Sequence, residues 1–185
     1  MPLFYARKDS LMYYSCKYAS PIGELTLASD GDALTGLWIR GQKYFAHNYT
    51  NPIEAPSLPV FQEVTAWLDL YFAGTFLPPA QLPLKPAGSP FQQRVWDILL
   101  RIPVHQTLTY GQIAEQLGNS GAAQAVGAAV GRNPISVIIP CHRVLGSGGK
   151  LTGYAGGIPA KTWLLRHERI LPNTESAGDL PRYLL

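Results

Sequence analysis

Short apolar runs separated by turn residues occupy the first forty residues of the chain. Three such runs cover residues 12–18, 25–29 and 34–39, and Pro-Ile-Gly and Asp-Gly-Asp lie in the gaps between them. Runs of this length, bounded by Gly, Pro and Asp, are typical of strands in a small antiparallel sheet. Apolar residues then recur at helical spacing over residues 61–72, until Gly74 provides a stop. We therefore predict one amphipathic helix packed on that sheet.

A proline-rich stretch at residues 77–89 follows this helix. Proline lacks the amide hydrogen that a helix interior needs, so we predict a linker here and place a domain boundary near residue 88. The expected organisation is an N-terminal α/β structural domain with its linker at residues 1–88, a second domain at 89–171 and a loose C-terminal tail at 172–185.

Start signals for helices follow one another after the linker, which predicts a mainly helical second domain. Ser89-Pro90 supplies an N-cap and a first helical position, and Pro103 ends that helix. Thr109-Tyr-Gly-Gln112 fits a capping box at the start of a helix of about two turns. After a short link, another helix is predicted over residues 121–130, with a stop at Gly131. Two short helices joined by a tight turn resemble a helix-turn-helix.

The predicted fold class is therefore α+β: a small N-terminal antiparallel sheet with a helix, then a mainly helical C-terminal domain with a winged-helix-like helix-turn-helix. Nearly every side chain of the helix at 121–130 is small. Gly121 and Gly127 lower the stability of that helix, but they allow another surface to approach its backbone closely. The helix either packs as a thin element against its neighbours or enters a groove of a nucleic acid.

The charge distribution favours a nucleic-acid partner without deciding the matter. Residues 90–185 hold nine Lys and Arg against five Asp and Glu, whereas residues 1–89 hold six against seven. A modest positive excess attracts polyanions, although it is also common on ordinary solvated surfaces. Neither a signal peptide nor a run of membrane-spanning length is visible. We therefore expect no membrane partner and a cytoplasmic protein, or a nuclear one in a eukaryote.

Cysteine is the candidate for chemistry. Cys16 and Cys141 are the two cysteines of the chain and form no C-x-x-C pair, so neither a disulfide framework nor a cysteine-built zinc site is expected. The apolar run at 137–139 predicts a buried strand that delivers Cys141 to a loop, next to His142. A base near a thiol favours the reactive thiolate, although a free cysteine is often only a small buried hydrophobe. Neighbouring side chains of an extended chain point to opposite faces, so we expect a bridging water between the Cys141 sulfur and the His142 ring.

The segment Ile139-Pro-Cys-His-Arg-Val144 resembles the O6-alkylguanine-DNA alkyltransferase family. Gly131-Arg-Asn-Pro134 precedes it and Gly153-Tyr-Ala-Gly-Gly157 follows it, as in that family. The resemblance covers residues 90–171 and extends to three more motifs in the family's order and spacing, Phe91-Gln-Gln-Arg-Val-Trp96, Thr109-Tyr-Gly-Gln-Ile-Ala114 and Trp163-Leu-Leu-Arg-His-Glu168. The N-terminal half resembles the family in size, in its sheet-and-helix pattern and in Tyr71-Phe72-Ala73-Gly74.

This resemblance implies DNA repair by direct alkyl transfer. The protein would move an alkyl group from O6-alkylguanine, and also from O4-alkylthymine, to its own Cys141 in one irreversible turnover. No cofactor and no metal would be needed. Its partner would be double-stranded DNA, entered from the minor groove with the damaged base rotated out of the stack, and it would act as a monomer. The alternatives are a non-repairing protein that binds alkylated DNA, against which Cys141 counts, and a thiol hydrolase.

The resemblance also implies roles for individual residues. His142 would take the thiol proton of Cys141 through a water, Glu168 would hold that histidine, Asn133 would fix the loop, and Tyr110 would donate a proton to the departing guanine. From the residues alone, Glu168 could instead form a partly buried ion pair and Tyr110 could be an ordinary helix-start aromatic. The expected pocket residues are Val130, Val144, Tyr154, Ala155, Gly156 and Gly157. The expected DNA contacts are Tyr110, Ala122, Ala123, Gln124, Ala125 and Arg132.

Gln124 is the main departure from the family pattern. The family usually carries an arginine here that pushes into the base stack, whereas Gln124 is shorter and uncharged, which puts efficient base flipping in doubt. Ala155 bears only a methyl group, so the pocket is expected to accept adducts larger than methyl. The zinc site of some family members is not expected, because Cys16 and His47 lack convincing companions.

Overall fold

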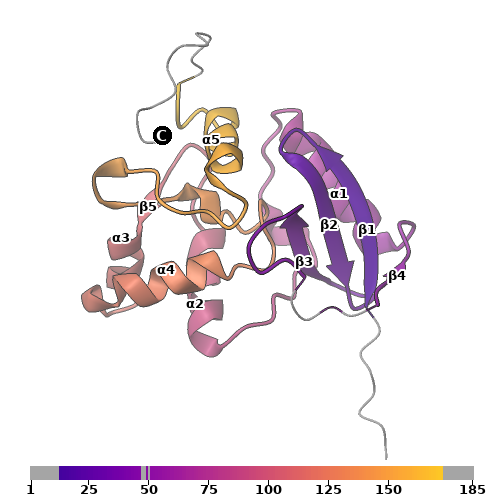
Figure 1. Cartoon of the computed structure of the whole chain (residues 1–185), viewed down its shortest axis with the longest axis horizontal. Helices are drawn as coiled ribbons and strands as arrows, with labels where there is room; N and C mark the ends of the chain where they lie inside the picture. Colours follow the sequence, from indigo (N-terminus) through magenta and orange to yellow (C-terminus); the bar gives the residue numbers. More distant parts are fainter. Residues whose placement is uncertain (1–12, 47–48, 50, 173–185) are drawn as a thin grey trace, which may run out of the picture.

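The computed structural model describes residues 13–46, 49 and 51–172 (Figure 1). Strands β1 (Tyr14–Ser20), β2 (Gly23–Ser29) and β3 (Leu34–Ile39) form the predicted antiparallel sheet. A short strand, β4 (Ile53–Glu54), extends the sheet in parallel with β1, which gives the order β3-β2-β1-β4. The α+β prediction is confirmed.

Helix α1 (Pro59–Phe72) packs on this sheet and buries one apolar stripe. The buried side chains are Val60, Phe61, Val64, Trp67, Leu68 and Tyr71. Gly74 adopts a φ of 88°, and its amide and that of Thr75 bond back to the carbonyls of Tyr71 and Leu70. Such a left-handed ending favours glycine, so the predicted stop is confirmed. The linker holds one short 3₁₀ turn, η1 (Pro79–Gln81).

The C-terminal half contains α2 (Pro90–Leu100), α3 (Tyr110–Gln116), α4 (Ala123–Gly131) and α5 (Ile158–His167), with the short turns η2 (Ser120–Ala122), η3 (Cys141–Arg143) and η4 (Ser147–Gly149). Strands β5 (Leu108–Thr109) and β6 (Val144–Leu145) pair in parallel. Both predicted starts are confirmed: α2 and α3 each begin with a full capping box, from Ser89 to Gln92 and from Thr109 to Gln112.

Two predictions for this half are wrong in detail. Residues 121 and 122 belong to the turn η2, in which the Asn119 side chain accepts the Gly121 amide, so α4 begins only at Ala123 and includes Gly131. Residues 137–139 form a compact turn instead of a strand, with Val137 at a φ of 70°. This turn is apolar because its side chains are buried where the two halves meet, and a short apolar run does not distinguish a buried turn from a strand.

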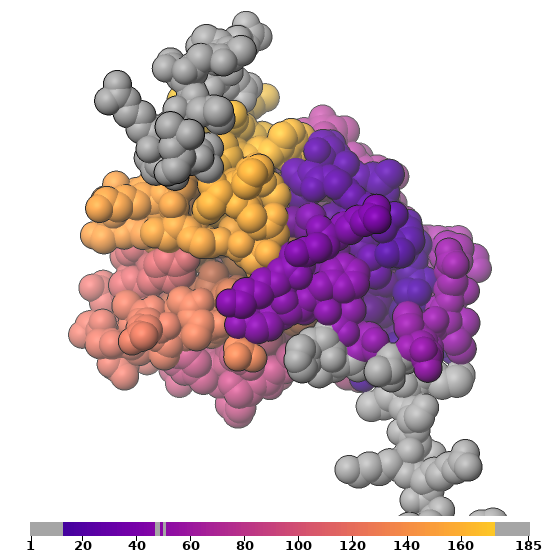
Figure 2. Space-filling view, viewed as in Figure 1, coloured from indigo at the N-terminus to yellow at the C-terminus, as the bar shows by residue number. Residues whose placement is uncertain are grey.

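The outer edge of β3 joins the two halves. The Leu37 amide donates to Pro134 O at 2.8 Å and Leu37 O accepts the Ser136 amide at 2.8 Å, while Leu34 bonds in the same way to Pro83 and Lys85 of the linker. One buried cluster extends from the sheet to α5, and Figure 2 shows the two halves in close contact. Within the described ranges, no helix is both long enough and apolar enough to cross a membrane.

Candidate active site

Cys141 opens the turn η3 and is buried, with 4% of its surface exposed. The Asn133 side chain holds the segment that leads to it. Its Nδ2 donates to Ile139 O at 2.8 Å and to Cys141 Sγ at 3.1 Å, and its Oδ1 accepts the Ile135 amide at 3.0 Å. Asn133 therefore both fixes the compact turn and contacts the sulfur.

His142 and Glu168 are in direct contact, although 26 residues separate them in the chain. The His142 Nε2 atom donates to Glu168 Oε1 at 2.8 Å, and Arg143 donates from Nε to Oε2 at 2.8 Å and from Nη2 to Oε1 at 2.9 Å. Glu168 caps the C-terminal end of α5 and is fully buried. A buried carboxylate is stable only when paired. Glu168 therefore forms both the predicted histidine contact and an ion pair with Arg143, which is buried more completely than the sequence suggested.

The electrostatics of these groups define their protonation states. Burial alone would raise the pKa of the Glu168 carboxyl, but His142 and Arg143 together hold that pKa well below its usual range. Burial lowers the pKa of His142, although Glu168 opposes this. With Nε2–H donating to Glu168, the neutral ring carries its lone pair on Nδ1, a buried atom with no hydrogen-bond partner within the described part of the chain.

The thiol of Cys141 is protonated at rest. Burial raises its pKa, and the hydrogen bond from Asn133 and the charge of Lys161 only partly oppose this effect. A thiolate must therefore be produced by removal of a proton when a substrate is bound. Between the described residues, no hydrogen bond joins the Cys141 sulfur directly to the His142 ring.

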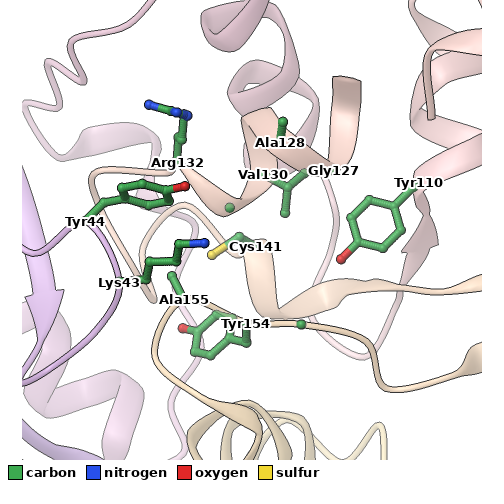
Figure 3. A pocket seen from close by; sticks show the side chains of 12 residues that line it. Lys43, Tyr44, Tyr110, Gly127, Ala128, Val130, Arg132, Cys141, Tyr154 and Ala155 are labelled. Carbon is green, nitrogen blue, oxygen red and sulfur yellow. The ribbon is translucent and has the colours of Figure 1, made fainter. Parts of the chain in front are cut away.

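A cavity of about 370 Å³ opens onto Cys141 (Figure 3). It brings together the predicted residues Tyr110, Val130, Arg132, Tyr154 and Ala155, and the other lining residues are Lys43, Tyr44, Gly127, Ala128, Gly131 and Gly153.

Three residues expected in the pocket do not line this cavity. Val144 is fully buried in β6, where it pairs with Leu108. Gly156 lies against the N-terminal sheet, where an added Cβ would come within 2.5 Å of Ile39 Cδ1. Gly157, with a φ of 87°, precedes α5 as its N-cap.

A shallow groove begins beside the cavity. Tyr110 and Gly127 line both, and the groove continues along Thr109, Gly111, Ala123, Gln124 and Ser147. The Tyr110 ring lies beside Gly127 of α4, where an added Cβ would make an ordinary contact of 3.7 Å with the ring. Of the other residues predicted to contact DNA, Ala125 and Arg132 are exposed and Ala122 is half-buried.

Two family models match the chain. The DNA-binding domain of 6-O-methylguanine DNA methyltransferase matches residues 90–170, and the ribonuclease-like domain of the same family matches residues 12–86. The chain belongs to this methyltransferase family. The resemblance noted in the sequence is thus confirmed, and the N-terminal half shares it.

Relatives of this methyltransferase chain match over most of their lengths. The methylated-DNA--protein-cysteine methyltransferase of Haemophilus influenzae is 42% identical over 159 residues, which is 86% of this chain and 87% of the relative. The Mycobacterium tuberculosis protein of the same name is 48% identical over 150 residues, 81% and 88% of the two chains. A crystal structure of Mycobacterium tuberculosis OGT in complex with DNA aligns with a TM-score of 0.76 and 46% identity, covering 85% of this chain and 92% of the other.

Sequence reasoning missed several residues at the methyltransferase site. Lys43 and Tyr44 come from the N-terminal half: the Lys43 amide donates to Ala155 O at 3.0 Å, and the Arg132 guanidinium lies 4.9 Å from the Tyr44 ring centre. Lys161 is fully buried, donates to Val144 O at 2.6 Å and Thr152 O at 2.9 Å, and has a pKa lowered by burial to about 8. In the sequence, the burial of Lys161 was indicated only by its position on the apolar face of α5.

Proposed function

We propose that this protein repairs DNA by transferring an alkyl group from O6-alkylguanine, and from O4-alkylthymine, to Cys141 in a single irreversible turnover. One observation carries the proposal. A buried thiol faces a cavity, and a neutral histidine held by a buried carboxylate is its sequence neighbour. This is the arrangement of a nucleophile, a base and a group that orients the base.

In the proposed reaction, the Cys141 sulfur attacks the alkyl carbon in line with the bond to the guanine oxygen. The sulfur–carbon bond forms as the carbon–oxygen bond breaks, and the electron pair of the broken bond stays with the base. The thiol proton passes through a water to Nδ1 of His142, whose Nε2–H stays bonded to Glu168. Tyr110, which lines the cavity, supplies a proton to the departing guanine, and the proton taken up by His142 is returned to Tyr110 through solvent, so that both side chains end neutral. Each protein is consumed because the thioether is stable.

Double-stranded DNA carrying the damaged base is the proposed partner. The groove along α4 meets the cavity at Tyr110 and Gly127, so a base rotated out of the minor groove would pass directly to Cys141. The relative from Mycobacterium tuberculosis is described in complex with DNA. One chain contains all of the proposed catalytic groups, so we propose a monomer that acts where the DNA lies, in the cytoplasm or a nucleus.

Intact-protein mass spectrometry after mixing with DNA that contains O6-methylguanine tests the function. We expect each protein molecule to gain the mass of one methylene group and the DNA to lose it. Cys16→Ser, at the second buried cysteine, is the matched control and is expected to react normally, whereas Cys141→Ser stays unmodified. Tight binding without any mass change would favour the non-repairing alternative, and many turnovers per protein would favour a hydrolase.

The cavity is also expected to accept a benzyl group. Ala155 presents only a methyl group to a space of about 370 Å³. Free O6-benzylguanine is therefore expected to inactivate the protein. Ala155→Leu places a larger side chain in the same wall and so narrows the cavity. The resulting overpacking should slow the benzyl reaction about tenfold or more relative to the methyl reaction. Rates of inactivation by both substrates measure the ratio, and an unchanged ratio would show that Ala155 does not limit adduct size.

A further inference from the structure

Tyr71 links the N-terminal half to the proposed catalytic groups. Its phenol donates to Glu168 Oε1 at 2.7 Å across 97 residues of sequence. Tyr71 lies on α1, and only 1% of its surface is exposed. The N-terminal half therefore contributes a buried hydrogen bond to the carboxylate that holds His142.

We propose that Tyr71 is a positioning residue for alkyl transfer, acting through Glu168 on the basicity and orientation of His142. The proposal rests on the proposed function above. It assigns to the N-terminal half a part in the chemistry, in addition to the cavity wall formed by Lys43 and Tyr44.

The two oxygens of Glu168 have different surroundings. Oε1 accepts from Tyr71, from His142 Nε2 and from Arg143 Nη2, at 2.7, 2.8 and 2.9 Å, whereas Oε2 accepts from Arg143 Nε. The phenol thus bonds to the same oxygen that holds the histidine. A hydrogen bond donated to Oε1 withdraws charge from it and weakens its attraction for a proton on the imidazole ring. Tyr71 therefore helps to keep His142 neutral, as a base must be.

The phenol is a permanent donor in this position. Burial, reinforced by the charge of Glu168, raises the pKa of Tyr71 well above its usual value. The ring is also fixed on both sides, since it stacks on Trp67 with centres 5.3 Å apart and meets the edge of Phe76 at 5.6 Å. The backbone is held as well, because His167 Nε2 donates to Tyr71 O at 2.6 Å.

The opposite end of the contact is fixed in the same way. His105 Nδ1 donates to the backbone carbonyl of Glu168 at 2.5 Å. With both backbones held, the bond from Tyr71 acts together with the two bonds from Arg143 to set the rotation of the carboxylate about its last torsion, and so the direction in which Oε1 faces His142. A contact that served packing alone would need the ring but not the hydroxyl.

Tyr71→Phe tests this proposal because it keeps the ring and removes the hydroxyl. We expect the second-order rate constant for methyl transfer from O6-methylguanine DNA to fall about threefold to tenfold at neutral pH, because only part of the free energy of the lost charge-assisted hydrogen bond bears on the transition state. The acidic limb of the pH–rate profile is expected to move to higher pH by about half a unit, because His142 then takes up a proton more readily.

Tyr18→Phe is the matched control. Its phenol donates to Asp69 of α1 at 2.7 Å, outside the Glu168 contacts, so it should leave both the rate and the pH profile unchanged. Replacing Tyr71 with a ring-fluorinated tyrosine, whose phenol is a stronger donor, gives a second variant of nearly native shape. Its acidic limb is expected to move the opposite way, to lower pH.

The outcomes separate the two proposals. If the wild type transfers no methyl group, the function proposed for Cys141 is wrong. If the wild type reacts and both Tyr71 variants match its pH profile, the role of Tyr71 is overturned, even where Tyr71→Phe lowers the stability of the fold. Opposite shifts of the acidic limb in the two variants support the proposal, since a loss of packing would move neither limb.

Discussion

Glu168→Gln is expected to slow methyl transfer about a hundredfold and to lower the free energy of unfolding by about 3–5 kcal/mol. The carboxylate accepts four hydrogen bonds from Tyr71, His142 and Arg143, and all of it is buried. An amide replaces one of the two acceptor oxygens by an NH2 group, whose N–H bonds then face donors only. Arg143 then remains buried without its counter-charge, and His142 loses the anion that fixes its proton on Nε2.

Single-turnover rates and denaturant unfolding of the same variant separate the two effects. Glu63→Gln removes a carboxylate from the exposed face of α1 and should change neither quantity by more than the error of measurement. The rate of the Glu168 variant is to be measured well below its unfolding midpoint, so that the folded fraction is complete. A normal rate of methyl transfer in a destabilised protein would show that Glu168 stabilises the fold through its ion pair but does not act in the reaction.

Gln124→Arg is expected to speed repair of duplex DNA about tenfold while leaving the reaction with free O6-benzylguanine unchanged. Gln124 is exposed and lines the groove that leads to the cavity. Extruding a nucleotide costs a few kcal/mol of stacking and pairing, and a side chain that fills the gap offsets part of that cost. Arginine offers a planar guanidinium that stacks on bases and a charge that phosphates attract, whereas glutamine offers a shorter neutral amide.

Gln116→Arg is the matched control for the added charge, because Gln116 is exposed at the end of α3 and does not line the groove. Both variants should be compared with the wild type at one fixed salt concentration. Equal acceleration by the two would mean that charge alone speeds encounter with DNA. Acceleration of the free-base reaction by Gln124→Arg would mean that the substitution acts on the cavity instead of on base extrusion.

Elements whose start is encoded by neighbouring residues could be predicted from the sequence. The capping boxes at Ser89 and Thr109 and the left-handed glycine after α1 satisfy backbone groups within a few residues of themselves, so the local pattern is sufficient. The turn at 137–139 could not be predicted in this way. Its shape depends on Asn133 and on the edge of β3, neither of which leaves a periodic signal in the apolar run.

The same distinction applies to the site. The segment from Asn133 to His142 and the distant Glu168 could be assembled from family motifs, and the structure places them together. The sequence could not predict the roles of Tyr71, Lys43 and Tyr44, because their contacts with the C-terminal half depend on how the two halves pack. Electrostatic roles of single side chains, such as the shared oxygen of Glu168, likewise appear only when all donors are located.

The bonded edge of β3 has a consequence for synthesis of the protein. Leu34 and Leu37 find their partners in the linker and in the segment Pro134–Ser136, which leaves the ribosome long after the sheet itself. Until then, the amides and carbonyls of this edge strand are available to a neighbouring chain, as in any sheet with an open edge. Translation that stops before Ile135 would therefore release a sheet that is prone to pair with other copies. Synthesis of the segment Pro134–Ser136, just before Cys141, covers this edge and prevents such pairing.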